Sequence, residues 1–385
     1  MPITIVDAIP LYDIDLGRAG KLPDLRTTLG VKSKSEAYSR YDASFEWLFE
    51  PQVAPSDGGS QDGDPMTAYY AQDVNCPRSL PGFDRFSLES DPHDPSDKGG
   101  LITVSPALKV AVVSIWRRYG PEENPLHIKH DLTSDIPDHY LKQLSVLFPH
   151  MAEGELMYPF VAVRYDSTDL QEVLARDAVA LGRLFSGGLD HEADDTFRTY
   201  LKDNLSIRKY EGLFLRSRDG LGVYTSGIED TPARDLLLYE NTMFRAVQVC
   251  ELCLLEHRLA RSFKMRVDHD ARKVRTFPRP FLVEKRRTEL LALEMGMVKS
   301  LPFRAPEAPA LVRKAQQRFS IPDRLREAKD SYDFLEARYQ NTKTTALAIL
   351  AVAAYIFDKM HVWEGISHWV QSYAHLVFHA LGHHR

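Results

Sequence analysis

Residues 322–359, PDRLREAKDSYDFLEARYQNTKTTALAILAVAAYIFDK, predict one long helix that decides the architecture of the C-terminal part of the chain. Pro322 and Asp323 are typical of a helix start. Apolar or small residues then recur at alternating spacings of three and four, at Leu325, Ala328, Tyr332, Leu335, Tyr339, Thr342, Ala346, Ile349, Ala353 and Ile356. This heptad pattern predicts a coiled-coil-like helix.

The heptad pattern leaves two kinds of partner open. We expect a homo-oligomer, and the alternative is packing on the chain's own helices. The residues expected to form the oligomer seam are Leu325, Tyr332, Leu335, Tyr339, Ile349 and Ile356.

The second half of this helix is apolar on every side. Residues 344–357 contain no charge, and Asp358 and Lys359 end the run. Fourteen helical residues extend for about 21 Å, whereas the hydrocarbon core of a bilayer is about 30 Å thick. The segment is therefore either a buried core or oligomer-interface helix, or a membrane-associated element.

Residues 361–381 predict a separate amphipathic helix beside this apolar segment. Five histidines fall on one face, and His375, His379 and His383 are spaced at i, i+4, which suits a transition metal. Two alternatives stay open, namely ordinary packing and a pH-sensitive or membrane-interfacial face with Trp363 and Trp369.

Residues 1–228 predict an α+β or α/β domain. The evidence is a set of runs rich in β-branched residues, separated by amphipathic stretches and an Asp-Gly hairpin signal. The expected strands cover about 3–6, 108–116, 158–165, 206–215 and 222–226, and the expected helices cover 137–148 and 170–185. Within this domain, residues 51–100 carry nine acids against three bases among many Gly and Pro residues, which predicts a long acidic surface loop.

Residues 229–321 predict a helical domain. Thr231 and Pro232 are typical N-cap and N1 residues for a helix of about 233–263. Cys250 and Cys253 lie one turn apart inside it, and we interpret them as buried core thiols. Further helices are expected at about 280–299 and 308–319.

A basic stretch, residues 258–287, contains eleven Lys or Arg against three acids, a local net charge of 11 − 3 = +8. We expect it to bind an anionic group, as in a nucleotide or an anionic lipid; the alternative is a solvated face that pairs with the acidic segment. The candidate ligands are Arg272, Lys273, Arg275, Lys285, Arg286 and Arg287. Nucleic acid is not favoured, because no aromatic stacking platform accompanies these cations.

The composition fits an intracellular globular protein. The 385 residues are 44% hydrophobic and 26% charged, with a net charge of −6 and three cysteines, which gives no basis for a disulfide framework. The N-terminus lacks the pattern of a secretory signal, so we expect a cytoplasmic protein or one at the inner face of a membrane. Phosphate-binding, nucleophile-elbow and zinc-protease motifs are missing from the sequence. No catalytic set or cofactor is predicted.

Residues 332–357 resemble the junction between the stalk and the first membrane helix of CorA-type divalent-cation channels. The resemblance implies a regulatory α/β domain followed by long helices and a stalk that enters an apolar segment. The Gly-Met-Asn signature of that family is missing, and residues 362–366 stand near its place. No pore or selectivity residue is therefore carried over.

Together these patterns predict an oligomeric sensor or effector protein with a regulatory N-terminal domain and a helical, membrane-associated C-terminal module. The alternative is a soluble cytosolic enzyme or effector that acts on a phosphate-containing ligand, with residues 344–381 as protein core.

Overall fold

The computed structural model describes residues 3–15, 84–105, 110–121, 128, 132, 135–149, 151–186, 210–273, 280–296, 308–359 and 365–374. The chain packs as two units. Unit 1 combines Met1–Phe263 with Leu291–Ala328, and unit 2 combines Lys264–Leu290 with Lys329–Arg385. These units differ from the three consecutive segments predicted above, because each unit combines stretches that lie far apart in the sequence.

Unit 1 is built on a seven-stranded mixed sheet with the strand order β2-β3-β4-β1-β5-β7-β6. All neighbouring strands are antiparallel except β5 and β7, which are parallel. The strands are β1 (Ile3–Asp15), β2 (Asp84–Leu88), β3 (Asp97–Ser105), β4 (Val110–Tyr119), β5 (Ala152–Tyr165), β6 (Glu211–Leu215) and β7 (Gly220–Thr225). The sheet and the helices that follow it confirm the predicted α+β class.

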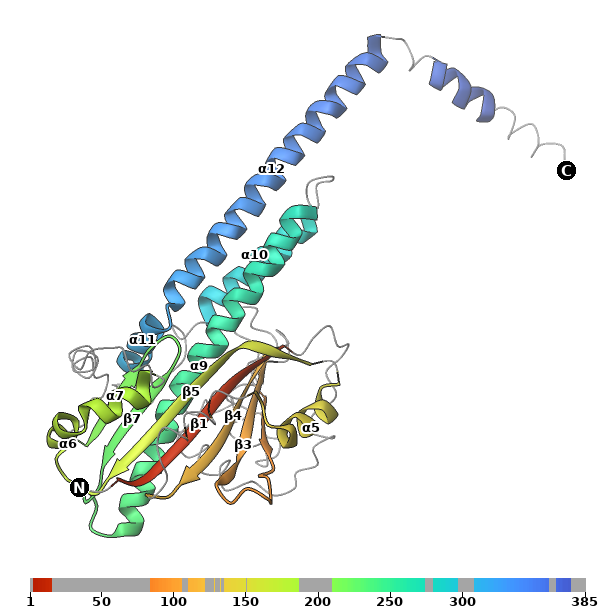
Figure 1. The fold of residues 1–385 in the computed structure, drawn as a ribbon. Helices are drawn as coiled ribbons and strands as arrows, with labels where there is room; N and C mark the ends of the chain where they lie inside the picture. The colour runs from red at the N-terminus through yellow and green to blue at the C-terminus, as the bar shows by residue number, and fades with distance from the viewer. Residues whose placement is uncertain are drawn as a thin grey trace, which may run out of the picture. The chain divides into compact units, whose positions relative to one another are not determined.

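One face of the sheet is covered by three short helices, α5 (Asp138–Leu147), α6 (Leu170–Arg176) and α7 (Ala178–Ser186) (Figure 1). Alternate residues of each strand point toward these helices, because side chains alternate across a strand. Tyr140 and Leu144 of α5 pack with Val113 of β4, whereas Val173 of α6 packs with Val163 of β5.

The opposite face of the sheet packs against α9 (Pro232–Lys273), a helix of 42 residues. Trp116 of β4 meets Phe244 edge-on, with ring centroids 5.0 Å apart. Tyr224 of β7 meets Tyr239 in the same way at 5.2 Å. The core of unit 1 therefore lies in two layers, one on each side of the sheet.

The remaining helices are α10 (Pro280–Gly296), α11 (Ala308–Arg318) and α12 (Ile321–Lys359). In unit 2 the end of α9, the start of α10 and most of α12 lie together. Tyr332 and Leu335 of α12 are buried there, as are Val283 and Leu290 of α10. A short helix over residues 365–374 follows α12.

Three expectations need correction. The described part of the predicted acidic loop, 84–100, contains β2 and the first residues of β3. Residues 84–88 pair with residues 100–104 of β3, and Leu88 is buried. The helix expected at 170–185 is two helices, separated at Asp177. The helix expected to end near residue 263 continues to Lys273, so α9 carries half of the basic stretch.

Candidate functional site

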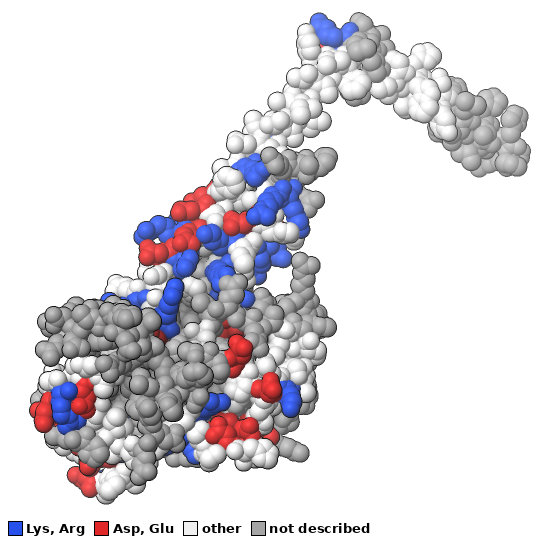
Figure 2. Space-filling view, in the orientation of Figure 1, with Lys and Arg blue, Asp and Glu red and all other residues white. Residues whose placement is uncertain are grey.

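The apolar half of α12 is exposed on all sides. Leu347, Ile349 and Leu350 are 57%, 64% and 65% exposed, although they point in different directions around the helix. Val352, Tyr355, Ile356 and Phe357 continue the same surface. In Figure 2 this stretch of α12 is free of charged residues, beyond the charged part of unit 2.

The polar groups next to this segment are turned inward to the helix backbone. The hydroxyls of Thr342, Thr344 and Thr345 each donate a 2.9 Å hydrogen bond to a carbonyl four residues earlier. Such bonds hide a hydroxyl from the surroundings. Residues 342–357 therefore present a largely apolar surface, and its polar exceptions are the ammonium of Lys343 and the hydroxyl of Tyr355. Among the described residues, no helix combines the length and the hydropathy needed to cross a bilayer.

The six expected seam residues differ in burial. Tyr332 and Leu335 are 5% and 0% exposed within the single chain. Leu325 and Tyr339 are half-buried, whereas Ile349 and Ile356 are 64% and 48% exposed. The beginning of the heptad pattern is thus used inside the chain, and its end is open to a partner.

The basic stretch also divides into buried and exposed cations. Arg286 donates to Asp270 at 2.7 Å, which joins α10 to α9 within unit 2, and to Glu289 of its own helix at 2.5 Å. Burial lowers the pKa of Arg286, but the hydrogen bonds to Glu289 and Asp270 outweigh it and raise that pKa. Arg286 is therefore engaged inside the hairpin and poorly placed to hold an external anion.

Four of the other candidate anion ligands are exposed, namely Arg272, Lys273, Lys285 and Arg287. Arg275 lies outside the described residues. Arg258, at the start of the basic stretch, belongs to unit 1, where it forms an ion pair of 3.3 Å with buried Asp13. Among the described cations of the stretch, those that are exposed lie on the α9–α10 hairpin, which is therefore the candidate anion-binding surface.

The predicted metal ligands His375, His379 and His383 lie outside the described residues. From the same predicted face, the structure describes His368, which is exposed on the helix 365–374. Within the described ranges, no group of three His, Cys, Asp or Glu side chains is arranged to hold a metal ion.

A buried charged network in unit 1 was not predicted from the sequence. Asp7 is fully buried on β1 and accepts hydrogen bonds from Trp116 at 2.8 Å, from Arg118 at 2.8 and 3.0 Å, and from Tyr239 at 2.6 Å. Arg118 also donates to Glu240 at 2.6 Å. The network joins β1, β4 and α9. The sequence signal was the occurrence of two acids, Asp7 and Asp13, in a mainly apolar strand. Their even spacing of six residues places both on one face of the sheet.

Glu256 is a further buried carboxyl, on α9. Glu256 is 1% exposed, and the amide of Gln316 donates to its two oxygens at 3.0 and 2.9 Å. Burial raises the pKa of Glu256 to about 8, and the Gln316 hydrogen bond opposes that rise. The raised pKa favours the protonated, neutral form of this side chain near neutral pH. Cys250 and Cys253 are buried free thiols, as predicted, and burial raises the pKa of both.

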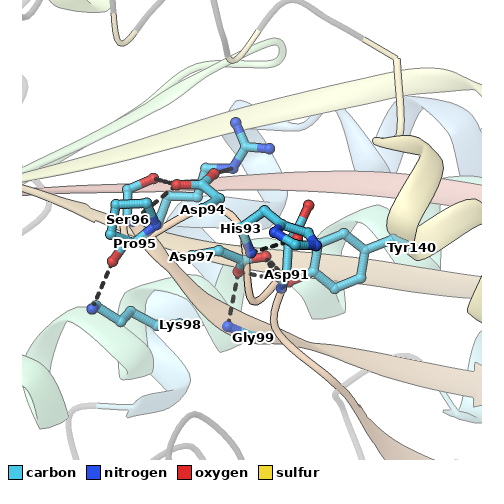
Figure 3. Close-up of polar contacts among 10 residues, drawn as sticks. Asp91, His93, Asp94, Pro95, Ser96, Asp97, Lys98, Gly99 and Tyr140 are labelled. Carbon is cyan, nitrogen blue, oxygen red and sulfur yellow. Dashed lines mark hydrogen bonds and ion pairs between the residues drawn. The ribbon is translucent and has the colours of Figure 1, made fainter.

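The acidic turn between β2 and β3 is held by its own carboxylates (Figure 3). Asp97 accepts from the Tyr140 hydroxyl at 2.6 Å and from the backbone N–H groups of Asp91 and Gly99 at 2.8 and 2.9 Å. Asp94 accepts from Ser96. Burial and the bond to Asp97 raise the pKa of Tyr140. These contacts give Asp94 and Asp97 a structural task, the shaping of the turn.

Gly99 has a φ of +99°, a conformation that a side chain disfavours, so this position in the turn requires glycine.

A comparison of the chain with protein-family models, curated proteins and solved structures finds no match. The resemblance of residues 332–357 to CorA-type channels therefore stays a prediction. The features that stand out chemically are the apolar end of α12 and the exposed cations of the neighbouring hairpin.

Proposed function

We propose that this chain is an oligomeric regulatory or effector protein that acts at the cytoplasmic face of a membrane. Unit 1 is the regulatory domain, and unit 2 is a helical module that self-associates and contacts lipid. The observation that carries the proposal is the exposure of apolar side chains on every side of α12 between Ala346 and Phe357.

This part of α12 has no polar face to turn toward water. A helix on the surface of a water-soluble protein keeps one polar face, and residues 346–357 have none. Fully burying one large apolar side chain contributes about 1.5–3 kcal/mol. A coiled-coil partner buries one stripe of the helix, and the remaining sides are accommodated best by lipid. Self-association and membrane contact are therefore proposed together.

The CorA resemblance supports the same order of parts, a regulatory domain, a stalk and an apolar end. The signature of the family is missing from this chain, so conduction of a cation is not part of the proposal.

A second candidate function is a soluble enzyme or effector that acts on a phosphate-containing ligand. The exposed cations of the α9–α10 hairpin favour it. It requires protein to cover the apolar end of α12, which the described residues of the chain leave exposed.

Flotation tests the first proposal. The purified full chain is mixed with phosphatidylcholine vesicles and separated on a density gradient, and its mass without lipid is measured by light scattering. We expect an oligomer that floats with the vesicles. The double variant Leu347→Gln/Leu350→Gln should lose flotation, whereas the control Val146→Gln, which changes a 73% exposed residue of unit 1, should not. A stable oligomer that never floats would favour the second candidate, and a monomer that never floats would contradict the proposal.

A further inference from the structure

The tip of the α9–α10 hairpin combines exposed cations with an exposed aromatic ring. We define this hairpin tip as Arg272 and Lys273 at the end of α9, and Phe281, Lys285 and Arg287 at the start of α10. We infer that the hairpin tip is a docking surface for the anionic headgroups of a lipid membrane. The inference rests on the proposed function and adds to it the class of lipid.

The charge of the hairpin tip is strongly one-sided. Among the described residues 271–273 and 280–288, four cations are exposed against one exposed carboxylate, Glu284. One acid lies next to the tip on each helix, Asp270 on α9 and Glu289 on α10. Both form ion pairs with Arg286, and Glu289 also lies 3.7 Å from Arg266. These acids are thus compensated within the hairpin, and the exposed surface keeps a net charge of 4 − 1 = +3.

Phe281 distinguishes this surface from an ordinary solvated basic face. It is 82% exposed, more than any other large apolar side chain in the described part of the chain. Lys285 lies one helical turn away on the same side of α10. An exposed aromatic ring beside cations is typical of elements that insert into the headgroup region of a membrane. An inorganic phosphate leaves the exposed ring unused. A nucleotide base could stack on the ring, but the exposed apolar end of α12 in the same unit favours a lipid surface.

The position of the hairpin tip supports the same partner. In unit 2, Tyr332 of α12 lies within electrostatic range of Arg287 and Glu284. The start of α10 and α12 are therefore neighbours, and α12 continues past the tip toward its apolar end (Figure 1). From Tyr332, which lies beside Arg287, to Ala346 the helix extends by about 21 Å. The hairpin tip therefore belongs to the same unit as the apolar end and precedes it along α12, so the two surfaces can meet one membrane.

Vesicle flotation with two lipid compositions tests the inference. The full chain is compared on phosphatidylcholine alone and on phosphatidylcholine mixed with phosphatidylserine. Wild type should bind the anionic vesicles more tightly, and the excess should fall with added salt. The variant Lys285→Gln/Arg287→Gln should lose roughly thirty-fold in affinity for anionic vesicles, because each cation near such a surface contributes about 1 kcal/mol. Its binding to neutral vesicles should be unchanged.

The matched control is Lys142→Gln/Lys314→Gln, which removes two exposed lysines of unit 1. It should retain the full preference for anionic vesicles. Phe281→Ser should weaken binding to both compositions and leave the salt dependence intact. An equal loss in the tip and control variants would overturn the inference, as would equal binding of wild type to both compositions. In these cases binding to neutral vesicles still supports the proposed function, whereas failure to bind either composition contradicts both.

Discussion

The guanidinium of Arg286 lies 2.7 Å from the carboxylate of Asp270 and so connects α10 to the end of α9. The side chains are 11% and 6% exposed. Each charge of this buried salt bridge depends on the other, because the loss of one partner leaves the remaining charge buried and without compensation. The pair therefore keeps the hairpin closed, while the exposed neighbours of Arg286 are available for binding.

Arg286→Gln should consequently destabilise the hairpin. The expected loss in unfolding free energy is about 2–4 kcal/mol, since Asp270 stays buried without its cation. Hydrogen exchange of residues 264–273 and 280–290 measures the effect directly. Arg287→Gln is the matched control and should change stability by less than about 0.5 kcal/mol, because its side chain is exposed. Equal protection in both variants would contradict the structural task assigned to Arg286.

Glu256 should make the stability of unit 1 depend on pH. Its pKa is raised to about 8 in the folded chain, against an ordinary value of 4.5. Between these two pH values the folded chain binds a proton that the unfolded chain releases. The contribution of Glu256 to the free energy of unfolding is therefore complete below pH 4.5, and it is lost as the pH rises toward 8 and beyond.

Glu256→Gln should flatten this dependence, because the amide stays neutral at every pH and Gln316 can turn its own amide to match. The variant should exceed wild type in stability at pH 8.5 by about 1–4 kcal/mol, on the scale of about 1.4 kcal/mol per pKa unit. Urea unfolding from pH 5 to pH 8.5 measures the slope. Some slope should remain, since burial also raises the pKa of Glu251. Glu172→Gln, at an exposed position of α6, should leave the slope as in wild type.

The Asp7 network should be sensitive to loss of any one donor. Tyr239→Phe removes a 2.6 Å hydrogen bond to a buried carboxylate and should cost about 1.5–3 kcal/mol of stability. Trp116 donates to the same carboxylate, so its fluorescence reports the integrity of the site. Tyr355→Phe is the control, because that ring is 63% exposed. A stability unchanged from wild type in Tyr239→Phe would show that the network does not hold α9 to the sheet.

Local patterns were sufficient to predict several elements. The β-branched run of β4, the N-cap Thr231 and the heptads of α12 each specify their structure within a few residues, and Thr231 Oγ1 accepts from the N–H of Arg234 as predicted. The strand β2 was missed, because Pro, Gly and Asp around it are typical of turns and its partner β3 follows only after the acidic turn.

The roles of the charged residues could not be predicted from one sequence. Eleven cations in a stretch appear equivalent by composition, yet Arg258 meets Asp13 from the other end of the chain and Arg286 meets Asp270 across the hairpin. These pairings depend on tertiary contacts between distant segments. The exposure of Phe281, which gives the hairpin tip its character, likewise depends on which face of α10 packs against its neighbours.

The predicted seam of α12 offers the sharpest test of how the two halves of that helix differ. Leu335 and Ile349 occupy equivalent heptad positions, two heptads apart, but Leu335 is fully buried in the chain and Ile349 is 64% exposed. Leu335→Asp should therefore unfold the helical packing of unit 2 at any protein concentration, because a charge would be buried without a partner. Ile349→Asp should leave the free energy of unfolding of the monomer within about 0.5 kcal/mol of wild type, and it should abolish self-association and flotation.

Circular dichroism during urea unfolding measures the effect on stability, and light scattering measures the effect on assembly. If Ile349→Asp assembled like wild type, the apolar end of α12 would not be the assembly surface, and if Leu335→Asp folded normally, the burial of that position would be wrong.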